Sequence, residues 1–149
     1  MKILAVDPGE KRIGLAISDP TGTIARPLCI IKHEARQKDA LKIVEIAHGE
    51  NVEMIVIGQA LDAEGEVGYQ ARKAGRLADA IREKTSCSVR LWDESGTTRA
   101  AILSQAAMGV PRKKRKGHLD DVAASIMLQD FLIANEESIN GGEVDRAQT

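Results

Sequence analysis

The chain has 149 residues, which suits a single domain, and its 29% charged and 43% hydrophobic residues are ordinary for a globular protein. The 21 basic and 22 acidic residues give a formal net charge of −1, so overall charge does not point to a nucleic acid. No apolar run approaches the roughly 18 residues that span a bilayer, and Asp7 interrupts the apolar N-terminus too early for a secretory signal. We therefore expect a protein that makes no membrane contact.

The basic residues are unevenly distributed. Five of the 21 are consecutive, Arg112 to Lys116, which leaves 16 basic against 22 acidic residues in the rest of the chain. Such a block is typical of a solvated loop or of a segment that binds a polyanion. Only three aromatic residues are present, which argues against a platform on which bases stack. Cys29 and Cys87 lack CxxC spacing, and we expect small buried side chains in a reducing compartment.

The N-terminal part of the chain has the pattern of three strands joined by short turns. Residues 2–7 are mostly apolar, which predicts a central strand. Large and small residues alternate in 13–18, which predicts a second strand. The third, at 24–31, contains Pro27, which sheets tolerate at an edge. Together these strands are expected to form an antiparallel meander.

Helices and strands alternate after residue 33. Apolar residues at helical spacing predict helices, and short apolar runs that end in turn residues predict strands. The expected elements are a helix at 34–48, a strand at 53–57, a helix at 67–84, a strand at 89–92, a helix from 95 or 97 to about 108, a basic loop at 110–117 and a last helix at 119–135.

This order, βββαβαβαα, predicts an α/β fold with a five-stranded mixed sheet and helices on both faces. Right-handed crossovers put the fourth strand beside the first and the fifth strand beyond it. The carboxyl ends of these three strands then meet at one edge, where sheets of this kind bind ligands. We expect residues 1–135 to form the domain and the polar residues 136–149 to be a flexible tail.

The first candidate functional residue is Asp7, at the end of the first strand. By alternation it shares a face with Ile3 and Ala5, and the second strand presents Gly14 and Ala16 on that face. Neighbours this small leave room for a bulky ligand such as a sugar-phosphate backbone. Taken alone, the segment is also explained by an Asp-Pro-Gly turn without further function.

Two more acidic pairs belong to the same edge. Asp93 and Glu94 end the fifth strand, where charged residues also commonly leave a sheet into water, and Glu94 has the reach to meet Asp7. Asp120 and Asp121 open the last helix, where acidic residues also complement the helix dipole. Asp120 shares a stripe with apolar residues at i+4, i+7 and i+11, so we expect it to face inward and Asp121 to face outward.

The carboxylates of Asp7, Glu94 and Asp120 would repel one another without a counter-ion, and oxygen ligands suit Mg²⁺ or Mn²⁺ rather than zinc. Two such ions activate water in phosphodiester hydrolysis. The basic block next to Asp120 is then a candidate for holding a phosphate backbone. The expected nucleic-acid contacts are Lys11, Arg12, Arg112, Lys113, Lys114, Arg115 and Lys116.

An ordered set of motifs resembles the YqgF family, also called RuvX. The similarity covers about residues 2–133. The matching motifs are Asp7-Pro-Gly-Glu-Lys-Arg-Ile-Gly-Leu-Ala-Ile-Ser-Asp19, Val56-Ile57-Gly58, Leu91-Trp92-Asp93-Glu94 with Thr97-Thr98, and Leu119-Asp120-Asp121-Val122-Ala123-Ala124 with Ile126-Met127-Leu128-Gln129.

The resemblance implies a ribonuclease H-like fold in a cytoplasmic bacterial protein. It implies a Holliday-junction resolvase or a nuclease that matures the 5′ end of small-subunit ribosomal RNA. It also implies a metal-dependent triad, which by motif is Asp7, Glu94 and Asp120. Two segments depart from the family pattern: Gln59-Ala60-Leu61-Asp62 replaces Leu-Pro and an Asn-containing loop, and Ser95-Gly96 replaces Arg-Leu.

We therefore expect a metal-dependent endonuclease, monomer or homodimer, that acts on RNA or branched DNA. The two departures favour an alternative, a non-catalytic nucleic-acid binder in transcription or ribosome assembly. Phosphotransferases of the actin and hexokinase group share the strand order, but they bind nucleotide between two such domains and this chain supplies one.

Overall fold

The computed structural model describes residues 1–59, 68–93 and 112–136, with the backbone alone at 69–70 and 112–121. The predicted helix within 95–108 and the tail from residue 137 onward lie outside this part of the chain. The elements are β1 (Ile3–Pro8), β2 (Arg12–Ser18), β3 (Ala25–Lys32), α1 (Arg36–Gly49), β4 (Met54–Gln59), α2 (Tyr69–Arg82), β5 (Ser88–Asp93) and α4 (Arg112–Ala134).

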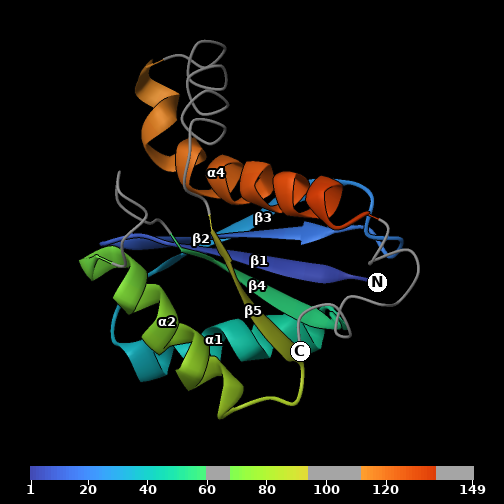
Figure 1. Ribbon diagram of the computed structural model, residues 1–149. Coiled ribbons are helices and arrows are strands. Elements are labelled where there is room, and N and C mark those ends of the chain that lie inside the picture. Colours follow the sequence, from blue (N-terminus) through green and yellow to red (C-terminus); the bar gives the residue numbers. More distant parts are fainter. Residues whose placement is uncertain (60–67, 94–111, 137–149) are drawn as a thin grey trace.

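Strand β1 lies at the centre of the sheet, as its apolar sequence predicts. The strand order is β3-β2-β1-β4-β5 (Figure 1). β1 pairs antiparallel with β2 and parallel with β4, and β4 pairs parallel with β5. The predicted order is therefore confirmed, and the carboxyl ends of β1, β4 and β5 lie at one edge of the sheet.

Strand β3 forms the outer edge next to β2, as Pro27 predicts. Pro27 lies opposite Ala16, where the register shifts after Leu15. Proline has no N–H to donate, so an irregular position on an edge strand accommodates it without loss of a ladder hydrogen bond.

Helices cover both faces of the sheet. In Figure 1, α1 and α2 lie on one face and α4 crosses the other. Alternation along the strands gives each face its own core. The core under α1 and α2 includes Leu4, Val6, Leu15, Ile43, Ile55, Ile57, Leu77 and Ile81. The core under α4 contains Ile3, Ala5, Ala16, Met54, Val56, Ala124, Met127, Leu128, Phe131 and Leu132.

The basic segment is helical, so its prediction as a loop is wrong. Helix α4 begins at Arg112 and continues through the basic residues to Ala134. Lysine and arginine have high helix propensity, and a proline at position 111 favours a helix start just after it. Gly117 costs about 1 kcal/mol relative to alanine, which does not end the helix. The basic residues therefore belong to the same helix as the apolar residues that close the second core.

No helix in the described part of the chain is both long and apolar enough to cross a membrane.

Gln129 joins α4 to the edge of the sheet. Its Oε1 accepts a hydrogen bond from the Ala25 N–H at 3.0 Å, and its Nε2 donates to the Thr23 carbonyl at 3.0 Å. Ala25 is the first residue of β3 and Thr23 lies in the turn before it, both more than 100 residues earlier in the chain. The side chain thereby fixes the helix against the edge strand.

We predict that Gln129→Ala lowers the free energy of unfolding by about 1–2 kcal/mol, because two hydrogen bonds are lost. Gln129→Glu keeps the acceptor for Ala25 and loses the donor to Thr23, so about half of that loss is expected at neutral pH. Urea denaturation measures both variants. Equal stability of wild type and Gln129→Ala would contradict the role assigned to this side chain.

Asp19 organises the turn between β2 and β3. Its Oδ1 accepts hydrogen bonds from the N–H groups of Ile24 at 2.9 Å and Thr23 at 2.8 Å, and its Oδ2 accepts one from the Thr21 hydroxyl. The Ile24 N–H, followed by the Thr21 hydroxyl and the Thr23 N–H, lowers the pKa of Asp19 far below its ordinary value. Gly22 completes the turn with a φ of 71°, which favours glycine.

The lowered pKa of Asp19 predicts a pH-dependent contribution to stability. The ionised carboxylate is favoured in the folded state, so its contribution is complete above the unfolded pKa of about 3.9 and is lost as the pH falls below that value. Asp19→Asn should therefore have a lower melting temperature than wild type at pH 7. The difference should shrink as the pH falls from about 5 to 2.

Glu45→Gln is the control, because it removes the same charge from an exposed position on α1. Its melting temperature should differ little from that of wild type over the same range. An Asp19→Asn deficit that does not change with pH would contradict the assignment.

Candidate nuclease site at the carboxyl edge of the sheet

Asp7 lies at the carboxyl end of β1, opposite Gly14 of β2. Ile3 and Ala5 belong to the core under α4, so strand alternation puts Asp7 on this same face. The predicted small neighbours are confirmed, because Ala16 packs in that core beside Ala5. Asp7 is half-buried, with no large side chain opposite it on β2.

The second predicted carboxylate, Glu94, lies outside the described residues. The strand that leads to it is described up to Asp93, which is exposed and lies opposite Gln59. Trp92 lies two residues before Glu94, and its ring meets Phe131 of α4 edge-on with centroids 5.2 Å apart. Trp92 is therefore on the α4 face, which is also the face of Asp7.

The third predicted carboxylate, Asp120, belongs to α4, whose backbone is described at this position. Ala124, Met127 and Phe131 are buried, as predicted for the stripe of Asp120. Leu128, seven residues after Asp121, is buried too, and the outward orientation of Asp121 itself stays a prediction because only its backbone is described. A helix that packs on a sheet buries a face wider than one stripe. Helical spacing therefore does not separate Asp120 from Asp121.

Among the residues that the structure describes with side chains, no group of three histidine, cysteine or acidic residues is close enough to hold a metal ion. Of the predicted triad, only the side chain of Asp7 falls within this set.

Cations surround this end of the sheet. Lys11 and Arg12, predicted as nucleic-acid contacts, are exposed at the tip of the β1–β2 hairpin. Arg12 lies opposite Lys32 of β3, and by alternation both are on the face of Asp7. Like charges directly opposite one another destabilise a sheet, which favours a role in anion binding. The sequence did not indicate Lys32, since its proximity to Arg12 depends on the strand register.

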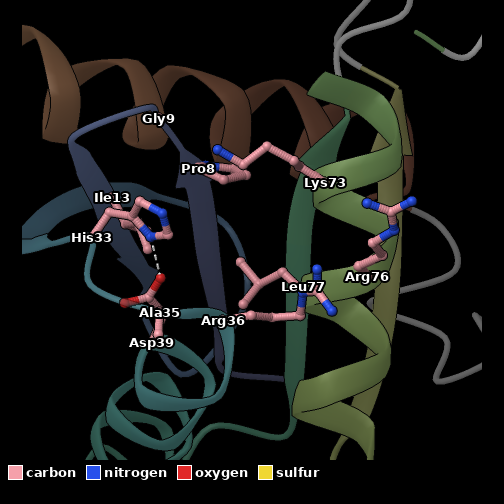
Figure 2. A pocket seen from close by; sticks show the side chains of 10 residues that line it. All are labelled: Pro8, Gly9, Ile13, His33, Ala35, Arg36, Asp39, Lys73, Arg76 and Leu77. Carbon is pink, nitrogen blue, oxygen red and sulfur yellow. Dashed lines mark hydrogen bonds and ion pairs between the residues drawn. The ribbon is translucent and has the colours of Figure 1, made fainter. Parts of the chain in front are cut away.

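A pocket of about 270 Å³ lies at the same end of the sheet, on the face covered by α1 and α2 (Figure 2). Pro8 and Gly9 of the turn after β1 contribute to its lining. Arg36 reaches in from α1, and Lys73 and Arg76 are contributed by α2. The other lining residues are Ile13, His33, Ala35, Asp39 and Leu77.

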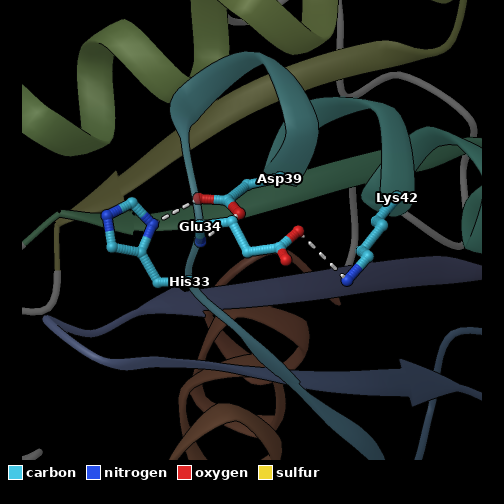
Figure 3. Close-up of polar contacts among 4 residues, drawn as sticks. All are labelled: His33, Glu34, Asp39 and Lys42. Carbon is cyan, nitrogen blue, oxygen red and sulfur yellow. Dashed lines mark hydrogen bonds and ion pairs between the residues drawn. The ribbon is translucent and has the colours of Figure 1, made fainter.

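The carboxylate of Asp39 in this pocket is buried and already has hydrogen-bond partners. Its Oδ1 accepts the Glu34 N–H at 3.0 Å, and its Oδ2 is hydrogen-bonded to Nδ1 of His33 (Figure 3). The backbone N–H of His33 donates a hydrogen bond to the Lys11 carbonyl at 2.9 Å. Glu34 forms an ion pair with Lys42 at 3.6 Å. The network connects the hairpin tip to the first turn of α1 and fixes one wall of the pocket.

Gln59, a departure from the family pattern, has a structural role. Its Nε2 donates a hydrogen bond at 3.2 Å to the Ala71 carbonyl in α2. This contact connects the end of β4 to the helix that follows it in the chain.

Solved structures with the same fold include Holliday-junction resolvases. The structure of Thermus thermophilus RuvC has a TM-score of 0.53 and 16% identity, covering 91% of this chain and 97% of RuvC. The structure of a Fowlpox virus resolvase in complex with Holliday junction DNA also has a TM-score of 0.53 and 16% identity. The match covers 91% of this chain and 99% of the resolvase chain. At this identity the similarity establishes the fold, which is ribonuclease H-like as expected.

Sequence comparison gives the class and the family. Proteins from Chloroflexus aurantiacus and Thermoanaerobacter pseudethanolicus, both named "Putative pre-16S rRNA nuclease", are 40% and 39% identical. These matches cover 93% and 89% of this chain and 90% and 96% of the relatives. The protein is a nuclease. It belongs to the RuvX family, described as Holliday junction resolvase, which matches residues 1–134.

The turn after β1 has no room for a side chain at Gly9. A Cβ at this position would lie 2.4 Å from the Arg12 carbonyl oxygen, closer than van der Waals contact allows. Gly9→Ala must therefore move the turn between Asp7 and Arg12, and we expect a loss of about 1–3 kcal/mol in the free energy of unfolding.

Gly75→Ala is the matched control, since a Cβ there meets nothing within 4 Å inside α2. It should stabilise the protein by about 0.5–1 kcal/mol in the same urea titration. If Gly9→Ala is as stable as Gly75→Ala, the close approach in the turn has no energetic consequence.

Proposed function

We propose that the protein is a metal-dependent endonuclease that matures the 5′ end of the precursor of 16S ribosomal RNA. The observation that supports it most is the location of Asp7. This half-buried carboxylate ends the central strand beside Gly14, on the face that α4 covers. The relatives named for this reaction match nearly the whole chain.

Asp7, Glu94 and Asp120 would hold Mg²⁺ or Mn²⁺. Their carboxylate oxygens are ligands of the kind that these hard cations prefer. Asp7 meets the requirement for accessibility because its neighbour across the hairpin has no side chain. Trp92 contacts α4 on the same face of the sheet as Asp7. Glu94 follows Trp92 by two residues in the chain, and Asp120 belongs to α4. When bound, such ions lower the pKa of water and neutralise charge on the reacting phosphate.

Cationic side chains would bind and orient the strand. Arg12 and Lys32 lie on the face of Asp7, where they attract phosphates and reduce the repulsion between the nucleic acid and the carboxylates. The basic residues from Arg112 to Lys116 form the first turns of α4, directly before Asp120 in the chain. A rigid helix fixes the spacing of these charges better than a loop would.

We propose RNA rather than branched DNA as the substrate, on the basis of the relatives' names, and action in the cytoplasm. The two described cysteines are free thiols, as is typical of a reducing compartment. The action of a single site on an RNA end requires no twofold symmetry, so a monomer suffices.

Cleavage assays test this function. The substrates are a precursor 16S rRNA fragment with its 5′ leader and a four-way DNA junction, each with and without Mg²⁺ or Mn²⁺. Cleavage of the precursor that depends on metal is expected. Asp7→Asn and Asp120→Asn should each lower the rate about 100-fold or more, as when one electrostatic stabiliser is removed from a preorganised site.

Asp121→Asn is the matched control for Asp120→Asn, because it changes the neighbouring carboxylate in the same helix turn. Calorimetric titration with Mn²⁺ provides a second measurement, in which Asp7→Asn should lose binding heat. Equal cleavage by wild type and Asp7→Asn would contradict the mechanism. Metal-independent, salt-sensitive binding without cleavage would support the alternative, a non-catalytic binder.

A further inference from the structure

We propose that the pocket between α1 and α2 binds a backbone phosphate of the nucleic-acid strand, away from the phosphate that is cut. The identity of the bound group rests on the proposed function, since the nucleic-acid strand is the substrate of that reaction. The site itself is distinct from the carboxylates: it lies on the opposite face of the sheet from Asp7 and is lined by different residues.

The first argument is charge. Arg36 and Arg76 line the pocket together with Lys73, which already has an interaction partner, and with the carboxylate of Asp39. That carboxylate accepts hydrogen bonds from His33 and from the backbone and forms no ion pair with either arginine. Among the described residues, Arg36 and Arg76 form no ion pair. Cations gathered around a cavity repel one another, and an anion in the cavity would relieve the repulsion.

The second argument is the position of Arg36. It is the first residue of α1, a helix of 14 residues whose N-terminal backbone N–H groups carry partial positive charge. A cation at this end of a helix is unfavourable by itself, because it adds to the positive end of the helix dipole. With an anion bound, the guanidinium and the helix end would act in the same direction.

The third argument identifies the anion. Among the residues described with side chains, no phenylalanine, tyrosine or tryptophan lines the pocket, so these residues offer no large aromatic surface for stacking a base. The exposed Arg36 and Arg76, which line the pocket from two helices, suit a phosphate, because guanidinium groups bind phosphate in a bidentate manner. The chemistry therefore favours the backbone of a strand over a free nucleotide held by its base.

The fourth argument is location. Pro8 and Gly9 line the pocket and directly follow Asp7 in the chain, with consecutive Cα atoms about 3.8 Å apart. A strand that passes around the end of β1 would meet the carboxylate on one face and the cationic pocket on the other. Lys11 and Arg12 at the hairpin tip follow Gly9 by two and three residues and are exposed. The pocket would then fix the register of the strand relative to the cut.

The test is the salt dependence of RNA binding. A fluorescently labelled precursor 16S rRNA fragment is bound in EDTA over a range of KCl concentrations, and affinity is measured by anisotropy. Each phosphate contact contributes about 0.7 to 0.9 to the slope of log affinity against log salt. Arg36→Gln/Arg76→Gln removes the contact with one phosphate and should therefore make the slope shallower by about 0.7 to 0.9. Arg36→Lys/Arg76→Lys should restore most of it.

Arg26→Gln/Lys38→Gln removes the same total charge from exposed positions outside the pocket and should leave the slope almost unchanged. Thermal unfolding checks that all variants are folded; if the double variant is not, the single variants replace it. Competition with AMP and with inorganic phosphate distinguishes the sources of phosphate. Displacement from the wild type by AMP but not by unlabelled RNA would overturn the proposal in favour of a nucleotide site.

An unchanged slope in Arg36→Gln/Arg76→Gln would overturn the pocket assignment even if the protein cleaves precursor RNA normally. Conversely, a protein that binds RNA with the expected slope change but never cleaves it would retain the pocket and lose the proposed reaction. The two failures are therefore separable, because binding in EDTA does not depend on the metal-binding carboxylates.

Discussion

The parallel pairing of β1 with β4 is the interaction on which the rest of the molecule depends. It joins the antiparallel N-terminal half of the sheet to the parallel half, and neither half has its full set of backbone partners without it. It also brings the end of β1 to the same edge as the end of β5. The end of β1, which carries Asp7, and the end of β5 at Asp93 lie at one edge only because this ladder forms.

Much of the fold could be predicted because its signals are local. Period-two patterns predicted the strands, and the apolar first strand and Pro27 predicted which strand is central and which lies at an edge. The right-handed crossover rule predicted that the fourth strand lies beside the first and the fifth beyond it. The basic segment from Arg112 was mispredicted because a run of charge says that residues face water and says nothing about backbone conformation. Lysine and arginine are good helix formers, so the same composition suits a helix. Leu128 is buried together with the stripe of Asp120, because the face that a helix buries against a sheet is wider than one stripe.

The candidate site also contains residues that the sequence indicates and residues that it does not. Asp7 could be identified because strand alternation and the small residue opposite it are visible in the sequence. Arg36, Lys73 and Arg76 could not, because they come together only through the packing of α1 and α2 on one face of the sheet. Lys32 is a similar case, since its position beside Arg12 is set by the strand register. Residues that come together only through tertiary contacts have no fixed spacing in the sequence, so no motif identifies them.

The position of α4 at the C-terminal end of the described chain has a consequence during protein synthesis. The sheet can assemble as soon as β5 has left the ribosome, yet its second apolar face has no cover until Ala124 to Leu132 emerge. During that interval Ile3, Met54 and Val56 are exposed to solvent on a nearly complete sheet, a condition that promotes aggregation of nascent chains. The sheet face under α4 is therefore the part of the fold most prone to aggregation until synthesis has passed Leu132.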